Sequence, residues 1–131
     1  PDLSLIELSK YRLDKAREML SAAQRDADAE DFASANNRAY YCIFHTMRSV
    51  LALRKFTRQY LKPEVLPRKY SALISNAAII RNRSDYEYFY LCSTEDTRLL
   101  IAGAADFLSS VAAYLAPYYA LTPTKACSEP D

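Results

Sequence analysis

The chain has 131 residues, half of them hydrophobic, with a single glycine and a net charge of +1. This length suits one domain with a buried core, and so apolar a composition excludes a disordered chain. One glycine is too few for the turns of a β-sheet protein, so the composition predicts an all-α fold. We expect a helical domain over residues 1–121 and a flexible, polar tail over residues 122–131.

Positive charge gathers in the middle of the chain. Residues 48–98 carry ten Lys or Arg against five Asp or Glu, whereas residues 1–47 carry six against eight and residues 99–131 carry one against three. This bias favours an anionic ligand near the middle of the chain, although a solvated basic face gives the same pattern.

The three cysteines, Cys42, Cys92 and Cys127, lack the spacing of metal ligands, and the first two lie among apolar residues. Cys42 and Cys92 are therefore expected to be buried thiols, and the three cysteines together suit a reducing cytoplasm, with no metal and no cofactor expected. We expect no signal peptide at the start of the chain, and because we identify no apolar run of about 18 residues, we expect no membrane span.

The first helix is expected to begin at Ser4, because Ser4 and Glu7 have the spacing of a capping box. An acidic stretch follows, in which Asp31 is expected to be the N-cap of a second helix. Both helices show apolar stripes with three- and four-residue steps. The stripe positions are Leu13, Ala16, Leu20, Ala23 and Ala27 in the first helix, and Phe32, Ala35, Ala39, Ile43, Met47 and Val50 in the second, widened by Tyr40, Phe44 and Leu51.

Residues 56–66 are expected to hold the main loop, and Pro67 to open a third helix that carries apolar residues up to Ile80. Ser93 and Asp96 have the spacing of a helix start, and Pro117 is expected to bend or end this fourth helix. Four amphipathic helices with mostly short connections predict an antiparallel up-and-down bundle. The stripe of the fourth helix is Leu100, Ala104, Phe107, Val111, Tyr114 and Tyr118.

One segment is not explained by packing in a bundle. It joins two guanidinium groups, an amide, a carboxyl and a phenol at Arg81, Asn82, Arg83, Asp85 and Tyr86. Guanidinium groups bind anions, and phenols stack, donate protons or are modified. We therefore expect the functional site in this segment.

Three stretches resemble signatures of the HEPN domain family. Residues 32–45 (FASANNRAYYCIFH) are similar to its second-helix signature, in which a run of small residues leads into A-Y-Y-x-x-F-H. Arg81-x-x-Ser84-Asp85-Tyr86 is similar to its R-x-x-[SA]-D-Y signature, and residues 104–107 to its A-x-x-F run. The resemblance covers residues 5–115, and the signatures have the family's order and spacing.

The resemblance implies an up-and-down helical bundle, commonly a homodimer, that binds RNA or nucleotides. Many members are metal-independent ribonucleases, often toxins paired with a nucleotidyltransferase antitoxin, and carry an R-x4–6-H signature. Here no histidine follows Arg81 or Arg83, and Tyr86 stands in its place. The resemblance thus implies a binding module that acts as, or derives from, a toxin endoribonuclease. The alternative is a non-catalytic dimeric interaction subunit of a nucleotidyltransferase.

Each residue of the segment has a functional and a structural interpretation. Arg81 suits the charge that develops on phosphate during attack by a 2′-hydroxyl group, or it caps helix carbonyls. Arg83 is a second phosphate contact or a solvated charge, and Asn82 orients a phosphate or ends a helix. Asp85 is a general base or the ion-pair partner of an arginine. Tyr86 is a weak base at neutral pH, but it suits a proton donor, a stacking platform, an AMP acceptor or a half-buried core residue.

His45 is the only histidine, and it lies in the second helix near Tyr41, Phe44 and Met47. This setting favours a core histidine with satisfied hydrogen bonds over a catalytic one. The second and fourth helices also carry more aromatic residues than one stripe needs, which predicts a homodimer interface. These surplus residues are Tyr40, Tyr41, Phe44, Tyr114, Tyr118 and Tyr119.

Overall fold

A computed structural model describes residues 3–60, 72, 73, 75 and 94–120 of the chain. They form three helices, α1 (Ser4–Asp28), α2 (Phe32–Tyr60) and α5 (Thr94–Tyr119), and residues 72, 73 and 75 are also helical. The described part of the chain contains no strand, which confirms the all-α prediction for it. The predicted count of four helices and the predicted tail depend on residues outside these ranges.

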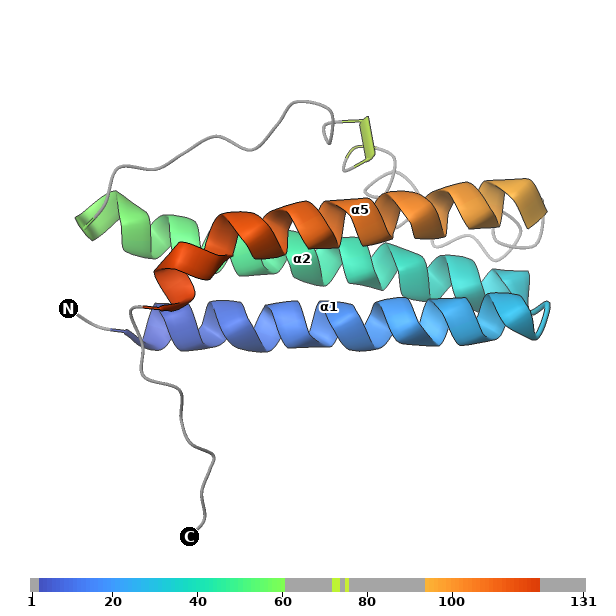
Figure 1. Ribbon diagram of the computed structural model, residues 1–131, viewed down its shortest axis with the longest axis horizontal. Helices are drawn as coiled ribbons and strands as arrows, with labels where there is room; N and C mark the ends of the chain where they lie inside the picture. Colours follow the sequence, from blue (N-terminus) through green and yellow to red (C-terminus); the bar gives the residue numbers. More distant parts are fainter. Residues whose placement is uncertain (1–2, 61–71, 74, 76–93, 121–131) are drawn as a thin grey trace, which may run out of the picture.

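The three helices lie side by side, with α1 antiparallel to both α2 and α5 (Figure 1). The C-terminal end of α2 and the N-terminal end of α5 lie at opposite ends of the bundle (Figure 1). Helices α2 and α5 therefore run in the same direction, as the second and fourth helices of an up-and-down bundle do.

The turn between α1 and α2 is held by backbone and side-chain caps. Glu30 has a φ of 64°, and the Asp31 and Glu30 N–H groups donate to the carbonyls of Asp26 (2.8 Å) and Ala27 (2.9 Å). This pair of bonds is a Schellman motif, which usually places glycine where Glu30 stands. The Asp31 carboxylate accepts a hydrogen bond of 3.2 Å from the Ser34 N–H, which confirms Asp31 as the N-cap of α2.

The predicted capping box at the start of α1 is wrong. The helix does begin at Ser4, but the N-cap is Leu3, whose side chain makes no capping hydrogen bond. The Leu3 carbonyl accepts from the N–H groups of Ile6 and Glu7. Ser4 therefore lies one position too late for its hydroxyl to act as the N-cap of this helix.

The start of the main loop was also placed too early. Helix α2 continues to Tyr60, four residues beyond the predicted loop start at Phe56. Arginine, lysine and glutamine are good helix formers, and no glycine or proline interrupts residues 54–60. The first residue able to break the helix is Pro63, which lies outside the described residues.

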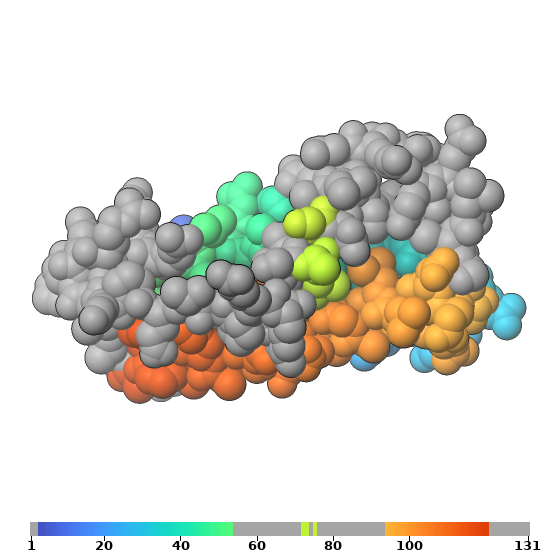
Figure 2. Space-filling view, turned by 90° about the horizontal axis from the view of Figure 1, so that it is seen from above, coloured from blue at the N-terminus to red at the C-terminus, as the bar shows by residue number. Residues whose placement is uncertain are grey.

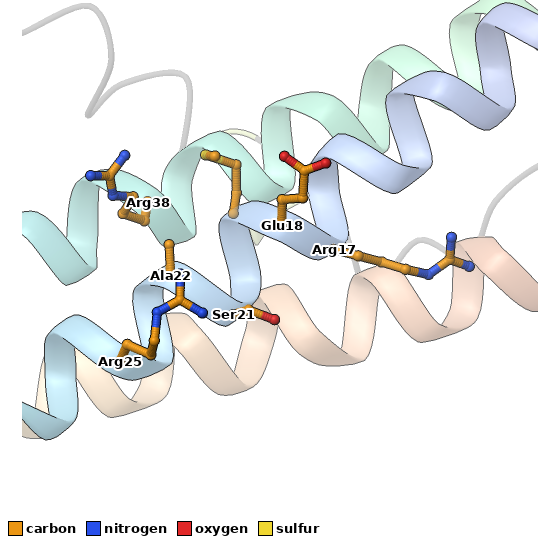
Figure 3. A pocket seen from close by; sticks show the side chains of 7 residues that line it. Arg17, Glu18, Ser21, Ala22, Arg25 and Arg38 are labelled. Atoms are coloured by element: carbon orange, nitrogen blue, oxygen red, sulfur yellow. The ribbon is translucent and has the colours of Figure 1, made fainter.

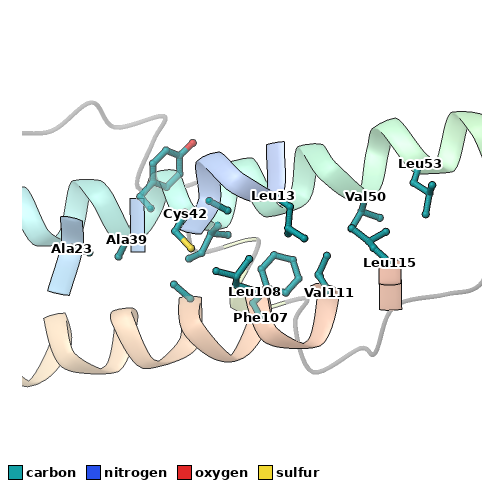
Figure 4. Close-up of a cluster of buried hydrophobic side chains, with 14 of the residues drawn as sticks. Leu13, Ala23, Ala39, Cys42, Val50, Leu53, Phe107, Leu108, Val111 and Leu115 are labelled. Carbon is teal, nitrogen blue, oxygen red and sulfur yellow. The ribbon is translucent and has the colours of Figure 1, made fainter. Parts of the chain in front are cut away.

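The core lies between the three helices (Figure 4). Most predicted stripe positions are buried there, including Leu13, Ile43 and Phe107. The prediction that Leu51 widens the apolar stripe of α2 is wrong, because this residue is 53% exposed. The buried apolar residues are Ile6, Leu13, Ala16, Ala23, Ala35, Ala39, Tyr40, Cys42, Ile43, Val50, Leu53, Ala104, Phe107, Leu108, Val111 and Leu115.

Cys42 is buried in this core, as predicted, and burial raises the pKa of its thiol to about 12, although its hydrogen bond with Thr46 acts in the opposite direction. A thiol so far from ionisation is a poor nucleophile at neutral pH. Cys42 is therefore a packing residue. Cys92 and Cys127 lie outside the described residues.

A buried hydrogen-bond chain ties the three helices together near the start of α1. The Ser9 hydroxyl donates to the Ser49 carbonyl at 2.8 Å and lies 2.7 Å from the Tyr119 hydroxyl. Helix α5 ends at Tyr119, two residues after Pro117, in agreement with the prediction that this proline ends or bends the helix. Tyr119, one of the aromatic residues predicted to form a homodimer interface, thus makes a hydrogen bond inside the bundle.

Helix α5 carries the single glycine, Gly103. A methyl group at Gly103 would lie 3.1 Å from the Leu73 Cδ1 atom, so the two segments approach closely there. Residues 72, 73 and 75 lie above α5, on the side opposite α1 (Figure 1), and in the view from above they lie in front of α2 and α5 (Figure 2). The predicted third-helix residue Leu73 therefore packs on α5 and the core.

By length and composition alone, α5 is also apolar enough to cross a membrane, with 28% of the apolar window buried in the structure. The sequence expectation of no such run was therefore too strict. Leucine and alanine account for most of this apolar character, and the buried face of α5 packs against α1 and α2. A single helix that meets this criterion is weak evidence for a membrane span.

Candidate functional site

The segment predicted to hold the site lies outside the described residues. This applies to each of its candidate residues, Arg81, Asn82, Arg83, Asp85 and Tyr86. Their roles in phosphate binding, proton transfer or modification stay predictions. Among the described residues, α1 and α2 carry charged groups and exposed aromatic rings that interact with one another.

His45 lies half-buried where α2 meets α1, and its surroundings are positively charged. Burial is the main cause that lowers its pKa, and the nearby charges of Arg12, Lys15 and Arg48 lower it further. The carboxylate of Glu18 acts in the opposite direction. The charges of three cations and one anion thus act on the imidazole, and together with burial they lower its pKa.

The hydrogen bonding of His45 corrects the sequence interpretation. Its Nδ1 atom is buried and has no hydrogen-bond partner, so it is not a core histidine with satisfied bonds. The ring packs edge-on against Phe44, with 5.5 Å between ring centroids, and tilts against Tyr41 at 6.4 Å. The guanidinium of Arg48 lies 4.8 Å from the centre of the Phe44 ring, a cation–π distance.

Helix α1 adds a second aromatic ring beside the same cations. Tyr11 is 53% exposed, and its ring centre lies 5.9 Å from the Arg12 guanidinium carbon and 5.8 Å from the Lys15 Nζ atom. On α2, Tyr41 is 39% exposed, whereas its neighbour Tyr40 is buried. We call the set Tyr11, Arg12, Lys15, Glu18, Tyr41, His45 and Arg48 the His45 surface.

An open hollow of about 560 Å³ lies next to this surface, mostly over α1 (Figure 3). Three arginines line it, but two are already paired. Arg17 donates to Asp14 at 2.9 Å, and Arg38 lies 3.5 Å from a carboxylate oxygen of Asp26. Among the described residues, these pairs leave Arg25 as the lining arginine without an ion pair. The lining residues are Arg17, Glu18, Met19, Ser21, Ala22, Arg25 and Arg38.

Sequence reasoning missed Asn36. Its side chain is 1% exposed, and neither amide atom has a hydrogen-bond partner. Leaving a buried amide unpaired costs free energy, and such groups often mark functional positions. The signal was present in the sequence, because Asn36 lies four and seven residues before the buried Tyr40 and Ile43.

The described residues contain no group of three or more histidine, cysteine, aspartate or glutamate side chains that could hold a metal ion. They do contain a set of cations and exposed aromatic rings, together with an imidazole whose pKa is lowered by burial and by these cations. Cations attract anions, and exposed aromatic rings offer flat faces on which planar groups can stack.

The sequence was compared with curated proteins, with solved structures and with models of protein families. Neither the search of curated proteins nor that of solved structures gave a significant match. The family model of the HEPN domain matches residues 9–114, a range that includes most of α1, all of α2, the Arg81–Tyr86 segment and most of α5. HEPN domains are helical modules that bind nucleotides or RNA, and often they are ribonucleases. Because the match covers well over half of the chain, the protein belongs to the HEPN domain family.

Proposed function

We propose that the protein is an RNA-binding HEPN module that acts as, or derives from, a metal-independent toxin endoribonuclease. The observation that carries this proposal is the family match, because it spans the Arg81–Tyr86 segment. Helix packing requires only apolar stripes and solvated faces, so it does not explain the residue types of this segment.

The chemistry follows from the residue types of the segment. Attack of a 2′-hydroxyl group on the adjacent phosphate builds negative charge on the phosphate oxygens. Arg81, with Arg83 and Asn82 assisting, would bind that charge through planar, permanently charged or amide donors. Tyr86 would donate a proton to the leaving 5′-oxygen, because a phenol is a better acid than base at neutral pH. Asp85 would accept the proton of the 2′-hydroxyl group or hold an arginine in place.

Binding tests the phosphate role. Fluorescence anisotropy with a labelled single-stranded RNA should show an affinity that falls steeply with salt. Arg81→Ala should weaken binding by about tenfold or more, the loss expected for a hydrogen bond to a charged group. An unchanged affinity in a folded Arg81→Ala variant would contradict the role of Arg81.

Cleavage tests the catalytic role. RNA should be cut slowly in the presence of EDTA, and Tyr86→Phe should remove most of this cleavage while binding stays intact. Tyr86→His should raise the rate, because histidine restores the family signature. Equal cleavage by the wild type and Tyr86→Phe would rule out proton donation by Tyr86. Incubation with a cognate nucleotidyltransferase and ATP, followed by intact-mass spectrometry, tests Tyr86 as an AMP acceptor.

A second candidate is a non-catalytic, homodimeric interaction subunit of a nucleotidyltransferase partner in the cytoplasm. The missing histidine favours it, and so do the exposed apolar side chains of Leu8, Leu51 and Leu99. Sedimentation equilibrium distinguishes the two candidates when it is combined with the RNA assays. A dimer that binds no RNA supports the interaction subunit.

A further inference from the structure

We propose that the His45 surface is a binding site for single-stranded RNA, formed by residues other than the Arg81–Tyr86 segment. This inference rests on the proposed function for the identity of its ligand. The His45 surface would be a second RNA-binding site, formed by α1 and α2. The residues involved are distant in sequence from the predicted segment and belong to the described structure.

The charges on this surface are arranged for a phosphate backbone. Arg12 and Lys15 come from α1 and Arg48 from α2, and all three act on the same imidazole. The described structure shows no ion pair for Arg12 or Arg48, whereas the Lys15 Nζ atom lies 3.5 Å from Glu18. Cations held near one another without enough anions attract a polyanion and gain when its counterions are released.

The rings on this surface are arranged for unpaired bases. Tyr11 and Tyr41 are exposed on the two helices that supply the cations. Lys15 connects them, since its Nζ atom lies 5.8 Å from the Tyr11 ring centre and its charge acts on His45, whose ring neighbours Tyr41. Alternation of cations with exposed aromatic rings is typical of surfaces that bind single strands without strong sequence preference.

Protonation of His45 makes RNA binding at this surface depend on pH. In the free protein, burial and the neighbouring cations oppose its protonation. A phosphate placed among Arg12, Lys15 and Arg48 cancels part of that repulsion, so the His45 pKa rises in the complex. Binding therefore takes up protons, and the affinity increases as the pH falls through the pKa of the bound state. Glu18 is the described carboxylate that faces His45, and it favours protonation in both states.

The first test uses the fact that the chain has one histidine. In NMR spectra of the full chain, the single imidazole signal gives the pKa of His45 directly. Addition of a labelled oligouridine should shift this pKa upward. The same RNA should bind Arg12→Gln/Arg48→Gln with a salt dependence lower by a slope of about 1.4, since each lost phosphate contact removes about 0.7. Arg17→Gln is the matched control, because Arg17 lies on α1 but its charge acts on Tyr119 and not on His45.

The second test predicts a gain of binding, which a misfolded variant cannot produce. Glu18→Gln removes the one described carboxylate near His45 and should tighten RNA binding severalfold. Asp14→Asn is its control, because it also removes one negative charge from an exposed position on α1 but acts on Tyr119. Equal tightening in both variants would mean a general charge effect and would overturn the site.

The outcomes separate this inference from the proposed function. RNA that binds with an unchanged His45 pKa and an unchanged affinity in Arg12→Gln/Arg48→Gln refutes the His45 surface and leaves the proposed function intact. Equal affinity for a duplex and a single strand of the same length refutes stacking on Tyr11 and Tyr41. Loss of self-association without loss of RNA binding in the double variant would identify the surface as a protein interface. Wild-type protein that binds no RNA overturns both proposals.

Discussion

The buried hydrogen-bond chain of Ser9, Ser49 and Tyr119 allows a sharp test of how the helices are joined. The hydroxyl of Ser9 has one proton, which it donates to the Ser49 carbonyl at 2.8 Å. The proton in its 2.7 Å contact with Tyr119 must therefore come from the phenol. Tyr119 is the donor, and Tyr119→Phe removes that donor while the ring remains in place.

The expected loss is that of one neutral hydrogen bond. Tyr119→Phe should lower the free energy of unfolding by about 0.5–1.5 kcal/mol. Ser9→Ala should cost about 1–3 kcal/mol, because it removes both bonds and strands a partly buried phenol. In the double variant the shared bond is lost only once, so the two losses should fail to add by about 0.5–1.5 kcal/mol.

Urea unfolding of the wild type, both single variants and the double variant gives this coupling energy. The pH dependence of the free energy of unfolding gives an independent check on the burial of Tyr119. Burial is the main cause that raises the pKa of Tyr119 to about 12. An unfolded tyrosine ionises near pH 10, so the unfolded state loses its proton first and stability declines as the pH rises from about 10 towards 12. Tyr119→Phe should lack this part of the decline. Additive losses with an unchanged pH profile would refute the hydrogen bond between Ser9 and Tyr119 and the donor inferred for it.

Three further predictions concern single positions. Glu30→Gly should raise the free energy of unfolding by ~1 kcal/mol in urea titrations, because Glu30 has a φ of 64° in a position that favours glycine; a loss of stability would contradict the Schellman turn. Asn36→Ala should cost less than ~1 kcal/mol, against ~2–5 kcal/mol for Leu13→Ala as control, since it deletes an amide whose burial is uncompensated; equal losses would show that Asn36 is paired. Because its folded pKa is lowered, His45 should reduce stability as the pH falls below about 6.5, and His45→Gln should show a smaller difference between pH 7.5 and 5.5; identical differences would rule out the lowered pKa.

Local signals in the sequence determined much of the bundle. The low glycine content and the apolar stripes predicted helices, and the stripe positions Leu13, Ile43 and Phe107 are buried. Asp31 was identified as an N-cap because the bond to Ser34 spans only three residues. The family signature in α2 and the Arg81–Tyr86 motif also led to the HEPN domain, which the family model confirms.

Only the tertiary structure decided which side chains from different helices meet. Periodicity gives the face of a helix but not its neighbour, so Leu51 was assigned to the core although it is exposed. His45 was expected to be a core residue with satisfied bonds, but α1 places Arg12 and Lys15 beside it, some thirty residues away in sequence. Charges act through space, and the sequence spacing of these residues contains no information on the angle at which α1 and α2 cross.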